Sequence, residues 1–184
     1  MQNISFQGHS SLFLNSKNFD KAARTAKSYY RDLGTKNKCT LRNGSVFTTS
    51  ADSDTLALIV RNNKSGFVKH VPTSGRIGKI IEEITQKIEE LKTDSKEKLT
   101  AWIIGGEKFE GEKGSNTINR VNELAEIVCD KPDIDASILA GSKKGAENIA
   151  LHPRAEGLEI TLDRTNCDLE DAFDIVELNN TEII

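Results

Sequence analysis

One histidine and two hydroxyl side chains are spaced in a way that suits nucleophilic catalysis. His70 ends the second strand of an expected hairpin, and Ser53 and Thr55 stand where the first strand begins. A nucleophile that faces an imidazole across a strand ladder has the geometry that nucleophile–base catalysis needs. This segment contains no cysteine, and a serine or threonine hydroxyl needs a third group to orient the base. Asp52 or Asp54 could be that group.

The hairpin is the best-marked element of the chain. Residues 56–60 are apolar at every position, which is typical of a strand covered on both faces. Residues 62–66 read Asn-Asn-Lys-Ser-Gly and predict a tight turn, since Asn and Gly tolerate positive φ. The hairpin is therefore expected to place His70 opposite residues 52–55.

The remaining pattern predicts an α/β (α+β) fold with one mainly antiparallel or mixed sheet and two long helices. Apolar residues at helical spacing indicate the helices, and short apolar runs between turn signals indicate the strands. The two long helices are expected over residues 77–91 and from Asn116 or Thr117 to Val128, and a further helix is expected from Asn18 to Gly34. Besides the hairpin, the expected strands are 39–41, 99–104, 134–139, 149–151 and 158–162, with one or two more within 4–14.

Length and charge narrow the class of protein. The chain has 184 residues, 36% hydrophobic and 29% charged, with a net charge of -3. This composition indicates a single globular domain, and it disfavours nucleic-acid or membrane-surface binding, which needs a basic patch. The sequence shows no signal peptide and no apolar run of membrane-spanning length. We expect a cytoplasmic protein whose partner is another protein, with its oligomeric state left open.

The cysteines and glycines predict no metal or cofactor. Cys39, Cys129 and Cys167 are far apart and form no CxxC pair, and the chain has three histidines. The glycine loops at 105–106 and 141–145 match neither a phosphate-binding loop nor a dinucleotide fingerprint. Cys39 is either a buried structural thiol or a nucleophile supplied by a neighbouring strand.

Between residues 46 and 162 the chain resembles the chemotaxis protein CheD. The similar motifs are Ala-Trp-Ile-Ile-Gly-Gly-Glu-Lys-Phe at 101–109, the helix opening Asn116 to Arg120 with Glu123, and Ala-Gly-Ser-Lys-Lys-Gly at 140–145. The order of elements matches as well. The resemblance implies a layered sandwich. Outside this core, residues 163–184 form an acidic segment in which Leu169, Phe173 and Val176 have helical spacing, and this segment is either a docking helix or a partner-binding tail.

The resemblance also implies an activity. CheD proteins are protein-glutamine deamidases of chemoreceptors, and the wider superfamily includes the cytotoxic necrotizing factor deamidases. Their nucleophile is a cysteine in a Leu-Gly-Ser-Cys motif upstream of a histidine. Counting back from His70 gives Ser53, Asp54 or Thr55, and the family's assisting hydroxyl corresponds to Thr48 or Thr49. The cysteine itself is absent from this sequence.

Three functions follow from these observations. The leading one is a pseudoenzyme, a CheD-like domain that has lost the nucleophile and binds a protein or ligand. The second is an active deamidase or amidohydrolase that pairs His70 with Ser53, Thr55 or Cys39. The third is a structural or adaptor protein that uses the acidic C-terminal segment as its contact element.

Overall fold

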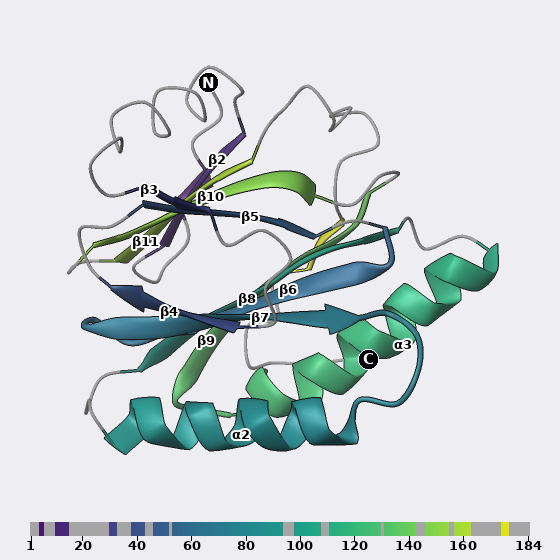
Figure 1. The fold of residues 1–184 in the computed structure, drawn as a ribbon, viewed down its shortest axis with the longest axis horizontal. Coiled ribbons are helices and arrows are strands. Elements are labelled where there is room, and N and C mark those ends of the chain that lie inside the picture. Colours follow the sequence, from purple (N-terminus) through teal and green to yellow (C-terminus); the bar gives the residue numbers. More distant parts are fainter. Residues whose placement is uncertain are drawn as a thin grey trace.

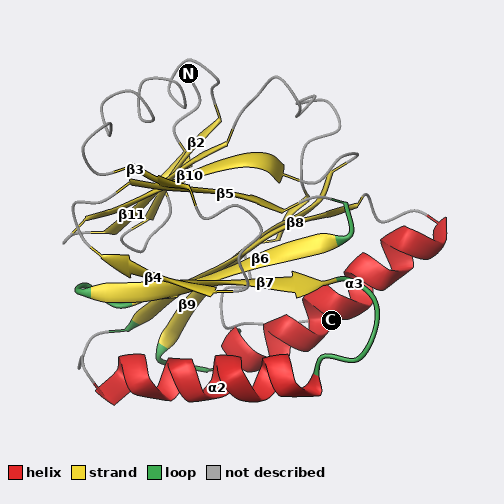
Figure 2. Cartoon of the chain, viewed as in Figure 1, coloured by secondary structure: helices red, strands yellow, loops and turns green. Residues whose placement is uncertain are grey.

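The chain folds into three layers, two β-sheets and one layer of helices (Figure 1). This computed structural model describes residues 4–5, 10–14, 30–32, 38–42, 46–51, 53–93, 98–107, 111–129, 131–142, 146–154, 157–162 and 174–176. Side chains are described only between residues 51 and 141. Figure 2 shows the helices on one face of the middle sheet, with the second sheet on its other face.

The middle layer, called here the central sheet, has the strand order β12-β9-β8-β6-β7-β4. The other layer, the outer sheet, has the order β1-β2-β11-β10-β5-β3. The central strands are β4 Lys38–Arg42, β6 Thr55–Arg61, β7 Ser65–Pro72, β8 Leu99–Glu107, β9 Ile134–Ser142 and β12 Asp174–Val176. The outer strands are β1 Ile4–Ser5, β2 Ser10–Leu14, β3 Tyr30–Asp32, β5 Val46–Ala51, β10 Ala146–Arg154 and β11 Gly157–Leu162.

The central sheet is mixed, as the sequence predicted. Strand β6 pairs antiparallel with both β7 and β8, whereas β8 and β9 run parallel. Parallel neighbours need a long crossover connection, and helix α3, Gly111–Val128, provides it. Helix α2, Gly78–Thr93, joins β7 to β8. The predicted α/β class with two long helices is therefore confirmed, but the strands form two sheets where one was expected. The helix expected from Asn18 to Gly34 is wrong at Tyr30–Asp32, which form β3; its other residues lie outside the described ones.

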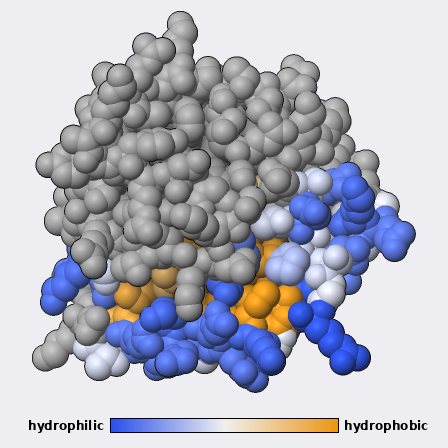
Figure 3. Space-filling view, viewed as in Figure 1, coloured by the Kyte–Doolittle hydropathy of each residue, from blue (hydrophilic) through white to orange (hydrophobic). Residues whose placement is uncertain are grey.

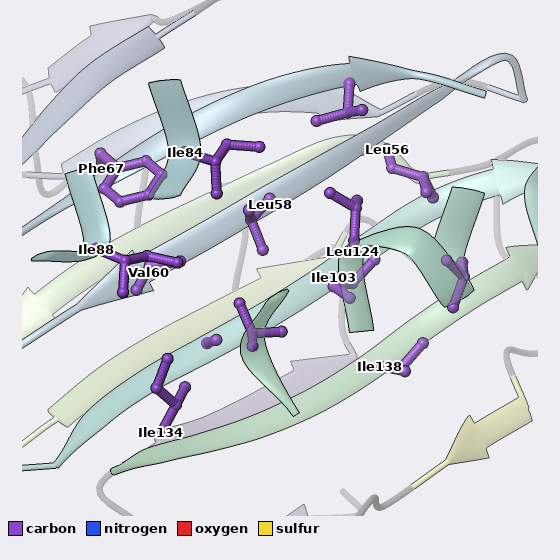
Figure 4. Packing of buried hydrophobic residues seen from close by; sticks show 14 of the residues in the cluster. Leu56, Leu58, Val60, Phe67, Ile84, Ile88, Ile103, Leu124, Ile134 and Ile138 are labelled. Carbon is purple, nitrogen blue, oxygen red and sulfur yellow. The ribbon is translucent and has the colours of Figure 1, made fainter. Parts of the chain in front are cut away.

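The core lies between the central sheet and the two helices. Leu56, Leu58 and Val60 of β6 belong to one buried cluster with Ile84 and Leu124 of the helices (Figure 4). Successive strand residues point to opposite faces of a sheet. Ala57 and Ile59 of β6 are fully buried as well but lie outside this cluster. They therefore face the outer sheet, which explains why β6 is apolar at every position.

Helix α3 begins at Gly111, five residues before the Asn116 start expected from the sequence. Thr117, one of the two expected starts, lies inside the helix, as does Ser115, and both hydroxyls donate to carbonyls one turn back. Ser115 Oγ donates to the Gly111 carbonyl at 3.0 Å and Thr117 Oγ1 to the Lys113 carbonyl at 3.2 Å. A hydroxyl residue therefore suggested a helix start at a position that lies more than one turn after the actual start.

The outward face of α2 is hydrophilic, as Figure 3 shows for the described surface on this side of the molecule. The charged side chains of Glu82, Glu83, Lys87, Glu89 and Glu90 are among those exposed on this helix. Neither described helix is long and apolar enough to cross a membrane.

The acidic C-terminal segment is partly a strand. Asp174–Val176 forms β12 and pairs antiparallel with residues 138–140 of β9. The docking helix expected in residues 163–184 is therefore wrong for these three positions. The rest of that segment lies outside the described residues.

An ion pair joins the end of α2 to the segment before β9. Lys92 Nζ lies 2.9 Å from Asp133 Oδ2 and 3.3 Å from Glu89 Oε1. The hydrogen bond from Lys92 lowers the pKa of the Asp133 carboxyl, and the hydrogen bond to Asp133 raises the pKa of Lys92. Both side chains are partly exposed, so water and salt screen the pair and keep its contribution within about 1 kcal/mol.

This pair predicts a pH-dependent term in stability. Because the folded-state pKa of Asp133 lies below its unfolded value, the stabilisation is complete above the unfolded pKa and is lost as the pH falls through the folded one. We expect Asp133→Asn to lower the unfolding free energy at pH 7 by up to about 1 kcal/mol. The difference from the wild type should shrink as the pH falls below about 4. Urea unfolding at pH 7 and pH 3 measures it, and a constant difference would contradict the assignment.

Candidate functional site

His70 lies in the ladder between β6 and β7, with Ala57 as its direct partner. Directly opposed residues of an antiparallel pair point to the same face, so His70 faces the outer sheet, as Ala57 does. It is 6% exposed and Ala57 is fully buried. The expectation that His70 stands opposite residues 52–55 is therefore wrong.

The hairpin turn sets the register of this ladder. The Asn62 amide donates to the Ser65 carbonyl at 2.9 Å, and Ser65 already belongs to β7. Arg61 consequently pairs with Gly66, which the sequence had placed inside the turn. Counting along both strands from the Arg61–Gly66 pair places Pro72, not His70, opposite Thr55.

The two expected hydroxyl nucleophiles are not aligned with the imidazole. Thr55 is diagonal to His70 across the ladder, a placement that separates the backbones by roughly 7–8 Å. Its hydroxyl donates to Asp54 Oδ1 at 3.2 Å. Ser53 is half-buried in the turn that precedes β6. Asp52, the other expected orienting carboxylate, lies outside the described residues.

Thr48 and Cys39 occupy other strands. Thr48 lies in β5 of the outer sheet, where its Cα partner in β10 is Ala150. Thr49 follows it and pairs with Ile149. Cys39 lies in β4 and pairs with Val68, two residues before His70. The side chains of all three lie outside the described residues.

Two exposed segments meet where β6 begins and β7 ends: residues 53–55 and residues 72–76, together called the paired loops. The Thr73 amide and the Thr73 hydroxyl both donate to the Asp54 carbonyl, at 2.9 Å and 3.1 Å. Thr73 is buried, whereas Asp54, Pro72, Ser74, Gly75 and Arg76 are exposed. Hydrogen bonds from the buried Thr73 thus hold an exposed polar surface at one end of the central sheet.

Helix α3 contacts the same end of the sheet. Arg120 Nη2 donates to the Gly75 carbonyl at 2.7 Å, and its Nη1 lies 2.6 Å from Glu123 Oε2. The Glu107 amide at the end of β8 donates to Thr117 Oγ1 of α3 at 3.2 Å. Hydrogen bonds therefore connect the paired loops to α3, and α3 to the end of β8.

Sequence reasoning missed Thr73 and gave Arg120 no role. Thr73 follows a strand end beside a proline, a place that reads as ordinary turn chemistry. Arg120 was part of the helix motif, and its position in the sequence does indicate that it is buried and paired. It falls within the apolar stripe of α3, one residue before Val121 and three after Thr117, where a charged side chain needs a partner.

The described residues contain no group of three or more His, Cys, Asp or Glu side chains that could hold a metal ion. Neither family models nor curated proteins match this chain. The candidate site is therefore defined by its own geometry.

Proposed function

We propose that this protein is a divergent, non-catalytic relative of the CheD-like deamidases that binds another protein through the paired loops. The observation that carries the proposal is the ladder register at His70. Ala57 stands opposite the imidazole, and the nearest hydroxyl on β6, that of Thr55, donates to Asp54. A nucleophile and its base must lie within about 2.6–3.2 Å of each other.

The character of the paired loops supports a protein as the partner. Asp54 and Arg76 carry opposite charges, and both are exposed at the same end of the sheet as the exposed Ser74. A surface with both signs of charge suits the mixed polar surface of a protein better than a polyanion. Loops that a rigid scaffold holds are the usual carriers of recognition.

The hydrolase alternative has one observation in its favour, which is that Thr55 and His70 point to the same face of the sheet. It requires the Thr55 side chain to leave Asp54 and turn toward the imidazole. Activation by His70 would then still need a group to orient the base.

Site-specific photo-crosslinking tests the binding function. A benzoyl-phenylalanine residue placed at Ser74 samples the paired loops, and one placed at Gln86 on the exposed face of α2 is the matched control. We expect a discrete crosslinked protein from position 74 and none from position 86. The dissociation constant of that protein, once purified, should rise at least about tenfold with Arg76→Ala.

Equal crosslinking from both positions would contradict the proposed surface. An affinity unchanged by Arg76→Ala and by Asp54→Ala would do so as well, because both side chains are exposed within the paired loops. Neither substitution removes a buried group, so loss of folding does not confuse the result.

A further inference from the structure

Arg120 is a buried cation whose hydrogen bonds among the described residues lead to the paired loops and to its own helix. Its side chain is 6% exposed, and it lies between α3 and the loop that joins β7 to α2. Figure 1 shows that loop curving past α3 before α2 begins. Within the described part of the chain, Arg120 Nε has no hydrogen-bond partner.

These contacts are a poor source of stability. A buried charge carries a large desolvation cost, which is offset only when all of its donors are satisfied. Here one donor lacks a partner, and the Glu123 side chain that receives another is 50% exposed. If Arg120 were replaced by an apolar side chain of similar length, water would solvate both Glu123 and the exposed Gly75 carbonyl. The loss of folding free energy should therefore be small.

The same contacts are well placed to fix a conformation. Arg120 Nη2 holds the Gly75 carbonyl, and Thr73, two residues earlier, holds the Asp54 carbonyl through its amide and its hydroxyl. The line of contacts runs from α3 through the 72–76 loop to the 53–55 turn. A supporting shell of this kind keeps a recognition surface in one geometry.

We propose that Arg120 is a positioning residue, which locks the two paired loops into a single preorganised surface. This inference rests on the proposed binding function. For a partner that requires this one arrangement of the loops, the apparent affinity falls in proportion to the fraction of protein molecules that have the arrangement. Arg120 thus acts on affinity through Gly75 and Thr73 without touching the partner.

Amide hydrogen exchange in Arg120→Met tests the locking directly. The Thr73 amide is the reporter because it donates across the two loops. Its exchange should become about tenfold faster or more, the change that accompanies loss of one hydrogen bond. The amide of Ile103 in the buried strand β8 serves as the internal reference for global unfolding.

Asn62→Ala is the matched control. Asn62 is also buried, and its side chain accepts from the Lys64 and Ser65 amides and donates to the Leu91 carbonyl at the opposite end of the hairpin. This variant should lower global stability while leaving the ratio of Thr73 to Ile103 exchange unchanged. Equal ratios in Arg120→Met and in the wild type would overturn the proposal.

Two further variants cover a failure of Arg120→Met to fold. Arg120→Lys keeps one donor that can reach Gly75 and should restore part of the Thr73 protection. Thr73→Val removes only the hydroxyl bond to Asp54 and should speed exchange in the 53–55 turn without changing α3. No change in that turn would count against the line of contacts.

Binding is measured separately, through the crosslinking yield at position 74. We expect that yield to fall in Arg120→Met together with the Thr73 protection. Faster exchange with an unchanged yield would overturn the link to recognition. Unchanged exchange would overturn the locking role and leave the binding proposal standing, so the two failures can be told apart.

Discussion

Gly105→Ala is expected to destabilise the protein by about 3 kcal/mol or more. Gly105 has φ +107° in the middle of the central sheet, a backbone conformation that an L side chain rarely adopts. A Cβ at this position would lie 2.5 Å from the Ala51 Cβ and 2.8 Å from the carbonyl oxygens of Ala51 and Thr55. Those oxygens belong to backbone that the 53–55 turn holds in place, so relief requires the turn to move.

Gly78→Ala is the control for this prediction. Gly78 opens α2, and a Cβ there would meet nothing within 4 Å. The same chemical change should therefore alter stability by less than about 1 kcal/mol. Urea unfolding of both variants gives the comparison, and equal effects at the two glycines would refute the close approach of Ala51 to β8.

Leu124→Ala is expected to lower the unfolding free energy by about 2–5 kcal/mol. Leu124 is fully buried on the face of α3 that covers the central sheet, and Figure 4 shows it beside Ile103. Removing its side chain leaves a cavity between a helix and a buried strand, neither of which can collapse freely. The loss is large relative to the 5–15 kcal/mol that stabilises a typical domain.

Ile118 provides the matched comparison on the same helix. It is 38% exposed, so Ile118→Ala should change stability by less than about 1 kcal/mol. Thermal unfolding of the two variants distinguishes the buried face of α3 from its outward face. A larger effect at Ile118 than at Leu124 would mean that α3 packs through a different face.

The local pattern of the sequence predicted those elements whose burial is visible in their own residues. The apolar runs at 56–60 and 99–104 are the buried strands β6 and β8, and the stripe from Ile77 to Leu91 is the inner face of α2. These signals succeed because burial on one or both faces of an element is written into its own periodicity.

The site depended on features that periodicity does not encode. The partner of His70 depends on the turn and on the residue count along both strands, and counting from the Arg61–Gly66 pair places His70 opposite Ala57, two residues beyond Thr55. The glycines at 105–106 were interpreted as a turn, but β8 continues through them to Glu107. Glycine occupies position 105 because Ala51, a residue far away in the sequence, lies so close to β8 that a Cβ at this position would clash with it.

The most direct test of the central claim is a search for deamidation. Glutamine-containing peptides are incubated with the protein in water labelled with oxygen-18, and mass spectrometry follows incorporation of the label. The control is His70→Gln, which removes the imidazole and keeps a side chain of similar size. We predict the same background rate for both proteins, because the ladder places Ala57 opposite His70 and the Thr55 hydroxyl donates to Asp54. Faster incorporation by the wild type, abolished by His70→Gln in a variant that remains folded, would contradict the non-catalytic assignment.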